Sequence, residues 1–234
     1  MLFDPIHHTS FLLTQDATTN EGFLRLDVLL EWIEKTASEH ASLGNVNFEV
    51  LEKLNQAWVL YQWQMHIYRF PLRNETIKIK TWVQEMQHAK SLRLFEVYVN
   101  KSLCIELHTL WLVMNTQSRK LESLKVHGAQ FLEHSLPTKK ITFDRIGSNV
   151  WEEIHTITVS NEHLDFVGHV NNIQYIKWCM DIFQQNKNRK PIKKVHVQFA
   201  KESILNEVLT IHQNENQFKI THHDELRFWM KFEI

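Results

Sequence analysis

The stretch Asn161-Glu-His-Leu-Asp-Phe-Val-Gly-His-Val-Asn-Asn-Ile-Gln-Tyr-Ile-Lys-Trp178 decides the fold, because a polar loop passes directly into an amphipathic helix. The amide side chains of Asn171 and Asn172 can accept hydrogen bonds from the free N–H groups of a first helical turn. Apolar residues then recur at helical spacing, namely Ile173, Ile176, Met180 and Phe183. The sequence therefore predicts a helix that begins near Asn172 and buries one face.

Two ionisable residues of the same stretch, Asp165 and His169, lie just before this helix begins. The N-terminus of a helix favours negative charge, through its free N–H groups and the positive end of the helix dipole. An imidazole and a carboxylate beside it can stabilise an oxyanion and transfer a proton. A capped surface helix with an incidental histidine fits the same residues, so the motif alone leaves both interpretations open.

Composition is that of a folded protein with a large core. The chain has 234 residues, is 43% hydrophobic and contains 14 Phe and 8 Trp. Its net charge of −1 gives no global indication of a nucleic-acid or membrane partner. No apolar run is long enough for a membrane span.

The cysteines and histidines exclude several classes of site. Cys104 and Cys179 lack CxxC spacing and are typical of buried residues in a reducing compartment. The N-terminal residues MLFDPIHH lack the pattern of a signal peptide, so a cytoplasmic location is expected. The 15 histidines show no HExxH or Cys/His ligand spacing, and we expect neither a metal site nor a cofactor.

The order of predicted elements is the same in the two halves of the chain. A strand at 9–14, a helix at 26–42 and a connector at 45–56 are followed by strands near 57–69, 75–86, 90–99 and 102–115. Gly44 is the expected stop of the first helix. The second half gives a strand at 152–159, the helix after Asn171, and strands near 194–202, 206–213, 215–222 and 226–233. We expect residues 1–120 and 151–234 to form two repeats joined by a linker at 121–150.

Sequence similarity supports this duplication. Gly22-Phe-Leu-Arg-Leu-Asp-Val-Leu-Leu-Glu-Trp32 aligns with residues 168–178 at an offset of 146 (168 − 22). Asn74-Glu-Thr-Ile-Lys-Ile79 aligns with residues 206–211 at an offset of 132 (206 − 74). His169 then corresponds to Phe23, and Glu202 to Phe70. The alignment predicts ionisable groups in the second repeat and an apolar wall in the first.

Further segments carry a family resemblance: Leu164-Asp-Phe-Val-Gly-His-Val-Asn-Asn-Ile-Gln-Tyr175, Trp58-Val-Leu, Glu75-Thr-Ile-Lys-Ile-Lys-Thr-Trp82, Arg93-Leu-Phe95 and Trp111-Leu-Val-Met-Asn115 with Arg119 and Leu121. With them the chain resembles the acyl-acyl carrier protein (acyl-ACP) thioesterases of plants and bacteria. The resemblance implies an α+β double hot-dog fold, in which each repeat wraps an antiparallel sheet around a helix. It also implies hydrolysis of fatty acyl-ACP to free fatty acid, ending fatty acid synthesis, with acyl carrier protein as partner.

The resemblance also implies roles for individual residues. Asp165, His169 and Glu202 match the family's catalytic residues. Glu202 is expected to act as base or nucleophile, and Asp165 to orient His169. Ser203 stands where many relatives have Cys, and Val167 where the family usually has Asn. The thioester carbonyl is expected near the N–H groups of residues 168–170, with Val167, Gly168 and Asn171 as substrate-binding residues. The acyl slot is expected in the first repeat, lined by Phe23, Trp32, Trp58 and Phe70.

A basic segment after the second helix suits an acidic carrier protein, and we expect docking through Lys187, Arg189, Lys190, Lys193 and Lys194, with Lys139-Lys140 adding two charges. A solvated loop is the alternative. An acyl-CoA thioesterase, a dehydratase of the same fold and a non-catalytic acyl-thioester-binding protein remain open. A serine hydrolase is disfavoured, since the five glycines form no GxSxG. Monomer and homodimer are both compatible with the sequence.

Overall fold

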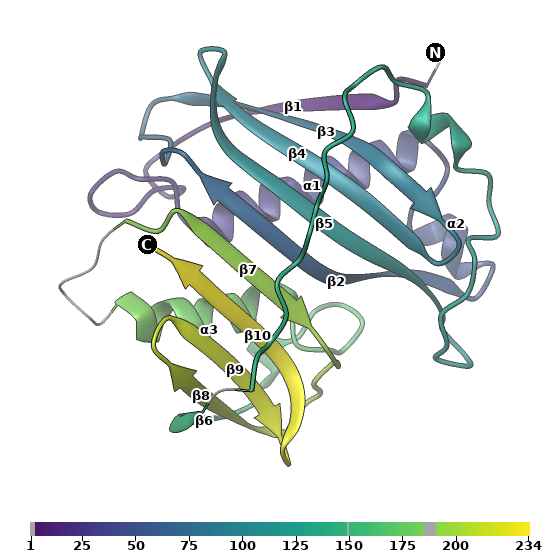
Figure 1. The fold of residues 1–234 in the computed structure, drawn as a ribbon. Helices are drawn as coiled ribbons and strands as arrows, with labels where there is room; N and C mark the ends of the chain where they lie inside the picture. The colour runs from purple at the N-terminus through teal and green to yellow at the C-terminus, as the bar shows by residue number, and fades with distance from the viewer. Residues whose placement is uncertain (1–2, 149, 185–190) are drawn as a thin grey trace. The chain divides into compact units, whose positions relative to one another are not determined.

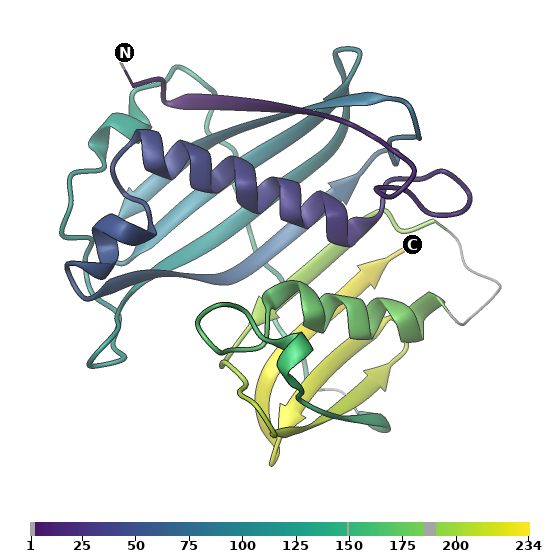
Figure 2. The same cartoon turned by 180° about the vertical axis from the view of Figure 1, so that it is seen from behind.

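The computed structural model describes residues 3–148, 150–184 and 191–234, and the chain divides into two compact units, Met1–Thr142 and Phe143–Ile234. In each unit a long helix lies across one face of an antiparallel sheet (Figures 1 and 2). The two units repeat one order of elements, as the sequence predicts. The α+β double hot-dog architecture is thereby confirmed.

The first unit has a sheet of order β1-β3-β4-β5-β2, with each pair antiparallel. Helix α1 crosses this sheet (Figure 2). The bounds of the elements are β1 Ile6–Leu12, α1 Leu26–Leu43, α2 Phe48–Glu52, β2 Gln56–Ile67, β3 Thr76–Gln87, β4 Lys90–Val99, β5 Ser102–Asn115 and the 3₁₀ helix η1 Ala129–Leu132.

The second unit has a sheet of order β6-β8-β9-β10-β7, again antiparallel throughout. This order matches that of the first unit strand for strand. The bounds are β6 Glu152–Thr158, the 3₁₀ helix η2 Asn161–His163, α3 Asn172–Gln184, β7 Lys194–Phe199, β8 Val208–Asn214, β9 Gln217–His222 and β10 Glu225–Glu233.

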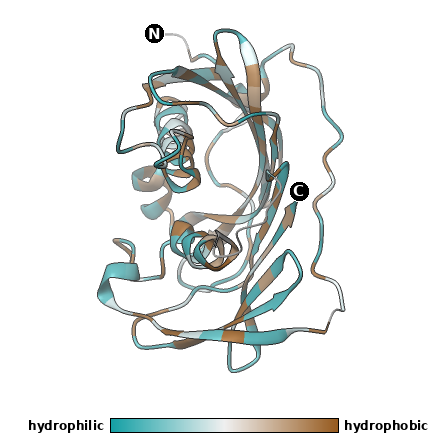
Figure 3. Ribbon diagram, turned by 90° about the vertical axis from the view of Figure 1, so that its left-hand side faces the viewer, coloured by the Kyte–Doolittle hydropathy of each residue, from teal (hydrophilic) through white to brown (hydrophobic). Residues whose placement is uncertain are grey.

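Each unit buries the apolar face of its helix against its sheet. Hydrophobic and hydrophilic residues alternate along the strands and helices (Figure 3). The buried face of α1 includes Leu26, Leu29, Leu30 and Ile33, and that of α3 includes Ile173, Tyr175, Ile176 and Cys179. Each fully buried aliphatic side chain contributes about 1.5–3 kcal/mol to the free energy of folding. This packing fixes the start of α3, where the candidate site lies.

Gly44 ends α1, as predicted, but for a different physical reason. Its φ of −93° is open to any residue, and the left-handed conformation is taken by Asn45, at φ 56°. A Cβ atom on Gly44 would lie 2.1 Å from Cζ of Phe131. Phe131 is fully buried against Val46 and Val83, although it comes from the segment expected to be linker. Close packing of that segment, not backbone conformation, requires glycine here.

A buried histidine and a buried arginine connect α1 to the sheet of the first unit. Arg93 Nη1 donates to Nδ1 of His40 at 3.0 Å, and His40 Nε2 lies 3.1 Å from the carbonyl oxygen of Asp4. Burial lowers the pKa of Arg93 to about 10, so it stays charged at neutral pH. The pKa of His40 is lowered to about 3, mainly by burial and then by the positive charge of Arg93 and by His7. The hydrogen bond to the Asp4 backbone raises this pKa, but by less. His40 is therefore neutral in the folded protein.

Acidification should destabilise this unit through His40. Its folded-state pKa lies below the unfolded value of 6.5, so the unfolded state takes up the proton first and stability falls as pH drops from about 6.5 toward 3. Between pH 7 and pH 4 we expect a loss of about 3 kcal/mol from this residue. Urea unfolding should show a smaller loss in His40→Gln, which keeps an acceptor for Arg93. The exposed His127→Gln should keep the wild-type dependence, and an unchanged dependence in His40→Gln would contradict a neutral His40.

Candidate active site

The loop before α3 is held by the side chain of Asp165. Asp165 Oδ1 accepts hydrogen bonds from the backbone N–H groups of Val167 at 2.9 Å and His169 at 3.1 Å. The backbone closes the same turn, because Asp165 N–H donates to the carbonyl oxygen of His169 at 2.7 Å. Gly168 has φ +89°, a left-handed conformation that favours glycine. The expectation was that Asp165 orients the imidazole ring of His169. The hydrogen bonds of its side chain go instead to the main chain that carries His169.

The loop brings His169 to Glu202, which follows β7. Nδ1 of His169 lies 3.5 Å from Oε1 of Glu202. The side chains are 27% and 34% exposed, so both are accessible to a substrate and to water. Two backbone contacts set this approach: a β-bridge joins His169 to Ile204, and Val170 N–H donates to the carbonyl oxygen of Ser203 at 2.8 Å. Two residues separated by 33 positions thus converge at the start of α3.

Asn171 caps α3, which begins at Asn172 as the sequence predicts. Its Oδ1 accepts from the N–H of Ile173 at 2.8 Å, and its carbonyl oxygen accepts from Gln174 at 2.9 Å. Asn171 N–H donates to the carbonyl oxygen of His163, whose ring packs edge-on against Trp178 with centroids 5.1 Å apart. The cap and this aromatic contact anchor the helix start beside His169.

The backbone N–H groups of residues 168–170 are all used within the protein. Gly168 N–H donates to the carbonyl oxygen of Asp165 at 3.1 Å, His169 N–H to Asp165 Oδ1, and Val170 N–H to Ser203. This corrects the expectation that these three groups face a thioester carbonyl. A substrate carbonyl at this site must be polarised by side chains or by other backbone groups.

The first unit contains the same loop without counterparts of Asp165 and His169. Gly22 has φ +86°, and Phe23 forms a β-bridge to Leu72, which corresponds to the bridge from His169 to Ile204. Thr19 stands at the position of Asp165: its N–H donates to the carbonyl oxygen of Phe23 at 2.8 Å, and its Oγ1 accepts from Phe23 N–H at 3.4 Å. Because the backbone is retained without His169, Asp165 and Glu202, the fold does not require these side chains.

The aromatic residues expected to line an acyl slot are partly used in packing. Trp32 stacks on Phe11 of β1 at 4.6 Å, and Trp58 Nε1 donates to the carbonyl oxygen of Val46 at 3.0 Å. Phe23 is 46% exposed, and Phe70 is half-buried. Trp32 and Trp58 therefore have structural partners, whereas Phe23 offers exposed apolar surface.

A cavity of about 410 Å³ lies within the second unit, where the sequence did not indicate one. Trp178 and Ile182 of α3 line it on one side, with Ile157 of β6 and Ile211 of β8. The ring of Trp178 connects this cavity to the anchored start of α3, because it also packs on His163. The cavity borders the helix that follows His169.

The basic docking residues are only partly placed. Lys187, Arg189 and Lys190 lie outside the described residues. Lys193 is exposed, whereas Lys194 Nζ pairs with Oε2 of Glu233 at 2.9 Å. Lys139 does not form a free patch: its ammonium group contacts the carboxylates of Glu96 at 3.2 Å and of Glu106. Lys139 therefore serves the packing of the first unit.

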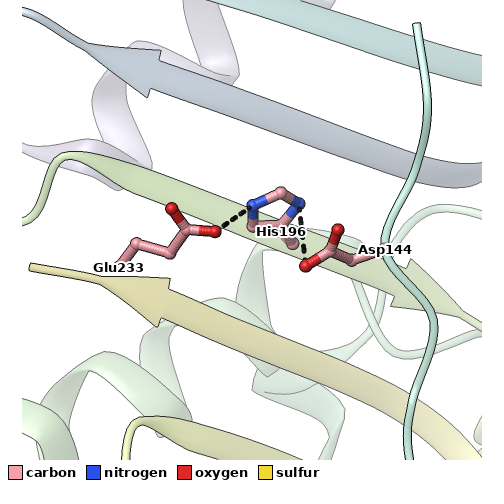
Figure 4. Close-up of side chains that lie close together, drawn as sticks. All are labelled: Asp144, His196 and Glu233. Carbon is pink, nitrogen blue, oxygen red and sulfur yellow. Dashed lines mark ion pairs between the residues drawn. The ribbon is translucent and has the colours of Figure 1, made fainter.

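Asp144, His196 and Glu233 form a cluster whose donor atoms all lie within 4.8 Å of one another (Figure 4). Both carboxylates already have ammonium partners. Lys231 Nζ lies 2.7 Å from Oδ2 of Asp144, and Lys194 pairs with Glu233. Burial lowers the pKa of His196, which favours its neutral form. A divalent cation would have to displace both lysines, so we interpret the cluster as an ion-pair network that holds the segment around Asp144 against β10.

Sequence reasoning missed the contacts that Arg227 and Glu207 make with the backbone on either side of Glu202. Arg227 is 3% exposed on β10, and its Nη2 donates to Oε1 of Glu207 at 3.1 Å. In the sequence, Glu207 was indicated only by the repeat alignment, where it corresponds to Glu75. Arg227 gave no signal, because an arginine in a strand is usually at the surface.

Two helix-and-sheet units with corresponding loops define a double hot-dog protein, and known proteins agree with this class. The acyl-ACP thioesterase N-terminal domain matches residues 5–127, and the acyl-ACP thioesterase C-terminal domain matches residues 148–228. The chain belongs to the acyl-ACP thioesterase family.

Similar solved structures share the whole fold. An acyl-ACP thioesterase from Bacteroides thetaiotaomicron is 22% identical with a TM-score of 0.86, covering 97% of each chain. The 12:0-ACP thioesterase from Umbellularia californica is 16% identical with a TM-score of 0.85, covering 100% of this chain and 98% of the other.

Among curated relatives, the chloroplastic oleoyl-acyl carrier protein thioesterase of Coriandrum sativum is 22% identical over an alignment of 152 positions that covers 59% of this chain and 41% of that protein. The chloroplastic palmitoyl-acyl carrier protein thioesterase of Cuphea hookeriana is also 22% identical, over 67% of this chain and 41% of its own length. The chain thus spans about two-fifths of each of these relatives. In the described part of this chain, no helix has both the length and the hydropathy to cross a bilayer.

Proposed function

We propose that this protein hydrolyses the thioester between a fatty acyl chain and acyl carrier protein, releasing free fatty acid. The observation that carries the proposal is the approach of His169 Nδ1 to Glu202 Oε1, 3.5 Å apart at the start of α3. Family membership supports the substrate class. The first unit has the same loop without these side chains, which further supports a chemical role for them.

In the proposed reaction Glu202 acts as general base. Its carboxylate accepts a proton from water as the water oxygen attacks the acyl carbonyl carbon. The C–S bond then breaks, and the sulfur leaves as the carrier thiol after taking a proton. Glu202 passes the proton taken from water to Nδ1 of His169, which it faces at 3.5 Å, as Nε2 of the same imidazole gives its proton to the sulfur, so both residues end in their starting protonation states. Asp165 contributes by holding the backbone N–H of His169.

The carbonyl oxygen requires a hydrogen-bond donor during this attack. The N–H groups of residues 168–170 are engaged, and both ring nitrogens of His169 take part in the proton transfer, so we assign this task to the Nδ2 amide of Asn171. Oδ1 of Asn171 is occupied by the helix cap, which leaves its NH₂ group for the substrate. Val167 is 55% exposed beside this site, and an amide there could donate as well.

Thiol release from acyl-ACP substrates of graded chain length tests the proposed function, with acyl-CoA of equal length beside each. We expect a kcat/KM at least about tenfold higher with the carrier protein than with CoA. The Val167→Asn variant, run in parallel, should be faster than the parent. Equal rates on both carriers would identify an acyl-CoA thioesterase. Binding without thiol release would identify a non-catalytic protein, and loss of water from 3-hydroxyacyl substrates a dehydratase.

The two left-handed glycines provide a matched pair of variants. Gly168→Ala and Gly22→Ala each place a Cβ atom on a residue with φ near +90°, at +89° and +86°, and neither atom meets a close neighbour. Each should lower the free energy of unfolding by about 1–2 kcal/mol through backbone strain. Only Gly168→Ala should also lower kcat/KM by tenfold or more, because it moves His169. Denaturant unfolding and thiol release measure both effects, and equal activities would contradict the assignment of the site to the second loop.

A further inference from the structure

Arg227 lies buried beneath the segment that carries Glu202. It stands where the pairing of β10 with β9 shifts register, between Leu226 and Phe228. At this irregularity its carbonyl oxygen accepts from the N–H groups of Ala200 at 2.8 Å and Lys201 at 3.4 Å. The main chain of Arg227 therefore holds the two residues that precede Glu202.

The side chain of Arg227 holds the residues that follow Glu202. Its Nη2 donates to Oε1 of Glu207 at 3.1 Å, and Oε2 of Glu207 accepts from the N–H of Ile204 at 3.3 Å. On the surface, Glu225 bridges the same region, because it pairs with Nη1 of Arg227 at 3.2 Å and with Lys201 Nζ at 2.8 Å. Glu202 thus lies in a short segment that is tied to one arginine on both sides.

The first unit makes the corresponding turn without a buried arginine. There the carbonyl oxygen of Cys104 accepts from the N–H groups of Tyr68 at 2.9 Å and Arg69 at 3.3 Å, so Cys104 stands where Arg227 does. Glu75 corresponds to Glu207 and accepts from Leu72 N–H at 2.7 Å. Its ion partner is Arg69, which belongs to the turn itself and is 41% exposed.

This difference between the units indicates a role beyond folding. Removing a guanidinium group from water costs several kcal/mol, and a buried ion pair is often no more stabilising than well-packed apolar residues. The first unit shows that the turn forms with a small buried thiol and a surface ion pair. The buried arginine occurs in the unit whose turn carries Glu202.

We infer that Arg227, acting through Glu207, is a positioning residue that keeps the carboxylate of Glu202 within reach of His169. This inference rests on the proposed function and adds a residue that does not touch the substrate. Rigid support of a reacting group matters because a displacement of about 1 Å can lower turnover about a hundredfold. Loss of the support should therefore lower kcat while leaving KM nearly unchanged.

Three variants test this role by kinetics: Arg227→Met, Glu207→Gln and the double variant of both. We expect each to lower kcat on acyl-ACP by at least about tenfold, with KM within about threefold of the parent. The double variant should regain thermal stability relative to Arg227→Met, since the half-buried Glu207 carboxylate is no longer left without its guanidinium partner, but should not regain kcat. Glu75→Gln, the matched change in the first unit, should keep the parental kcat. Parental kcat in folded Glu207→Gln would overturn the inference.

A second measurement does not depend on turnover. In a His169→Cys/Glu202→Cys protein, the rate of crosslinking by a short bis-alkylating reagent such as dibromobimane reports the distance between the two positions. Cys104 and Cys179 are buried and do not compete. Adding Glu207→Gln should lower the rate of crosslinking severalfold, whereas adding Glu75→Gln should not. An unchanged rate would refute the positioning role. A wild-type protein that hydrolyses no acyl thioester would instead refute the proposed function, and crosslinking would still decide the role of Arg227.

Discussion

Replacing Glu202 with Gln should abolish most thioester hydrolysis, with a fall in kcat of about a thousandfold or more. Gln keeps the shape of the side chain but cannot accept a proton from water, so general base catalysis is lost. The change also removes the carboxylate that lies 3.5 Å from Nδ1 of His169. His169→Ala should produce a loss of similar size, because the leaving thiol then lacks its proton donor.

The two changes should not be additive. When two residues act together in one step, removing either one abolishes most of the rate enhancement that both provide. The kcat of the double variant His169→Ala/Glu202→Gln should therefore be about as low as that of each single variant. Glu215→Gln, in an exposed turn of the same unit, serves as control and should keep the parental kcat. Stopped-flow or steady-state thiol release with purified proteins provides the measurement. Single variants that retain more than about a tenth of the parental kcat would remove these residues from the mechanism.

Replacing Phe131 with Ala should lower the free energy of unfolding by about 3–5 kcal/mol, the usual cost of deleting a fully buried aromatic ring. Phe131 lies in η1 and is the central member of a core cluster with Val46 and Val83. Its ring also packs against His40 with centroids 4.9 Å apart. The segment that carries it was expected from its composition to be a linker, so this prediction tests whether that segment supports the first unit.

Gly44 gives a sharper form of the same test. In the parent, Gly44→Ala brings a Cβ atom to 2.1 Å from the Phe131 ring and should cost about 1–3 kcal/mol or more. In the Phe131→Ala background the clash is gone, and the backbone of Gly44 at φ −93° accepts Ala. There the change should be neutral or stabilising by up to about 1 kcal/mol. Denaturant unfolding of the four proteins gives the coupling energy, and simple additivity would contradict the close contact.

Much of the fold follows from short-range patterns in the sequence. The spacing of Ile173 and Ile176 and the amide of Asn171 predicted where α3 begins, because helical periodicity and capping involve residues within a few positions of one another. The repeat alignment placed Gly22 over Gly168 and Phe23 over His169, and the structure gives these pairs matching backbone conformations and bridges. Side-chain identity at equivalent positions therefore indicated which unit carries the ionisable groups.

Other features were decided only by tertiary structure. Asp165 binds backbone N–H groups, the N–H groups of residues 168–170 are engaged, and Arg227 holds the backbone just before Glu202. Gly44 is required by a ring from a segment 87 positions away (131 − 44). Such contacts join residues far apart in the chain, and their existence depends on strand register and on the direction in which each side chain points. Local sequence determines helices, strands and caps, whereas hydrogen-bond partners and close packing are determined when the sheets assemble.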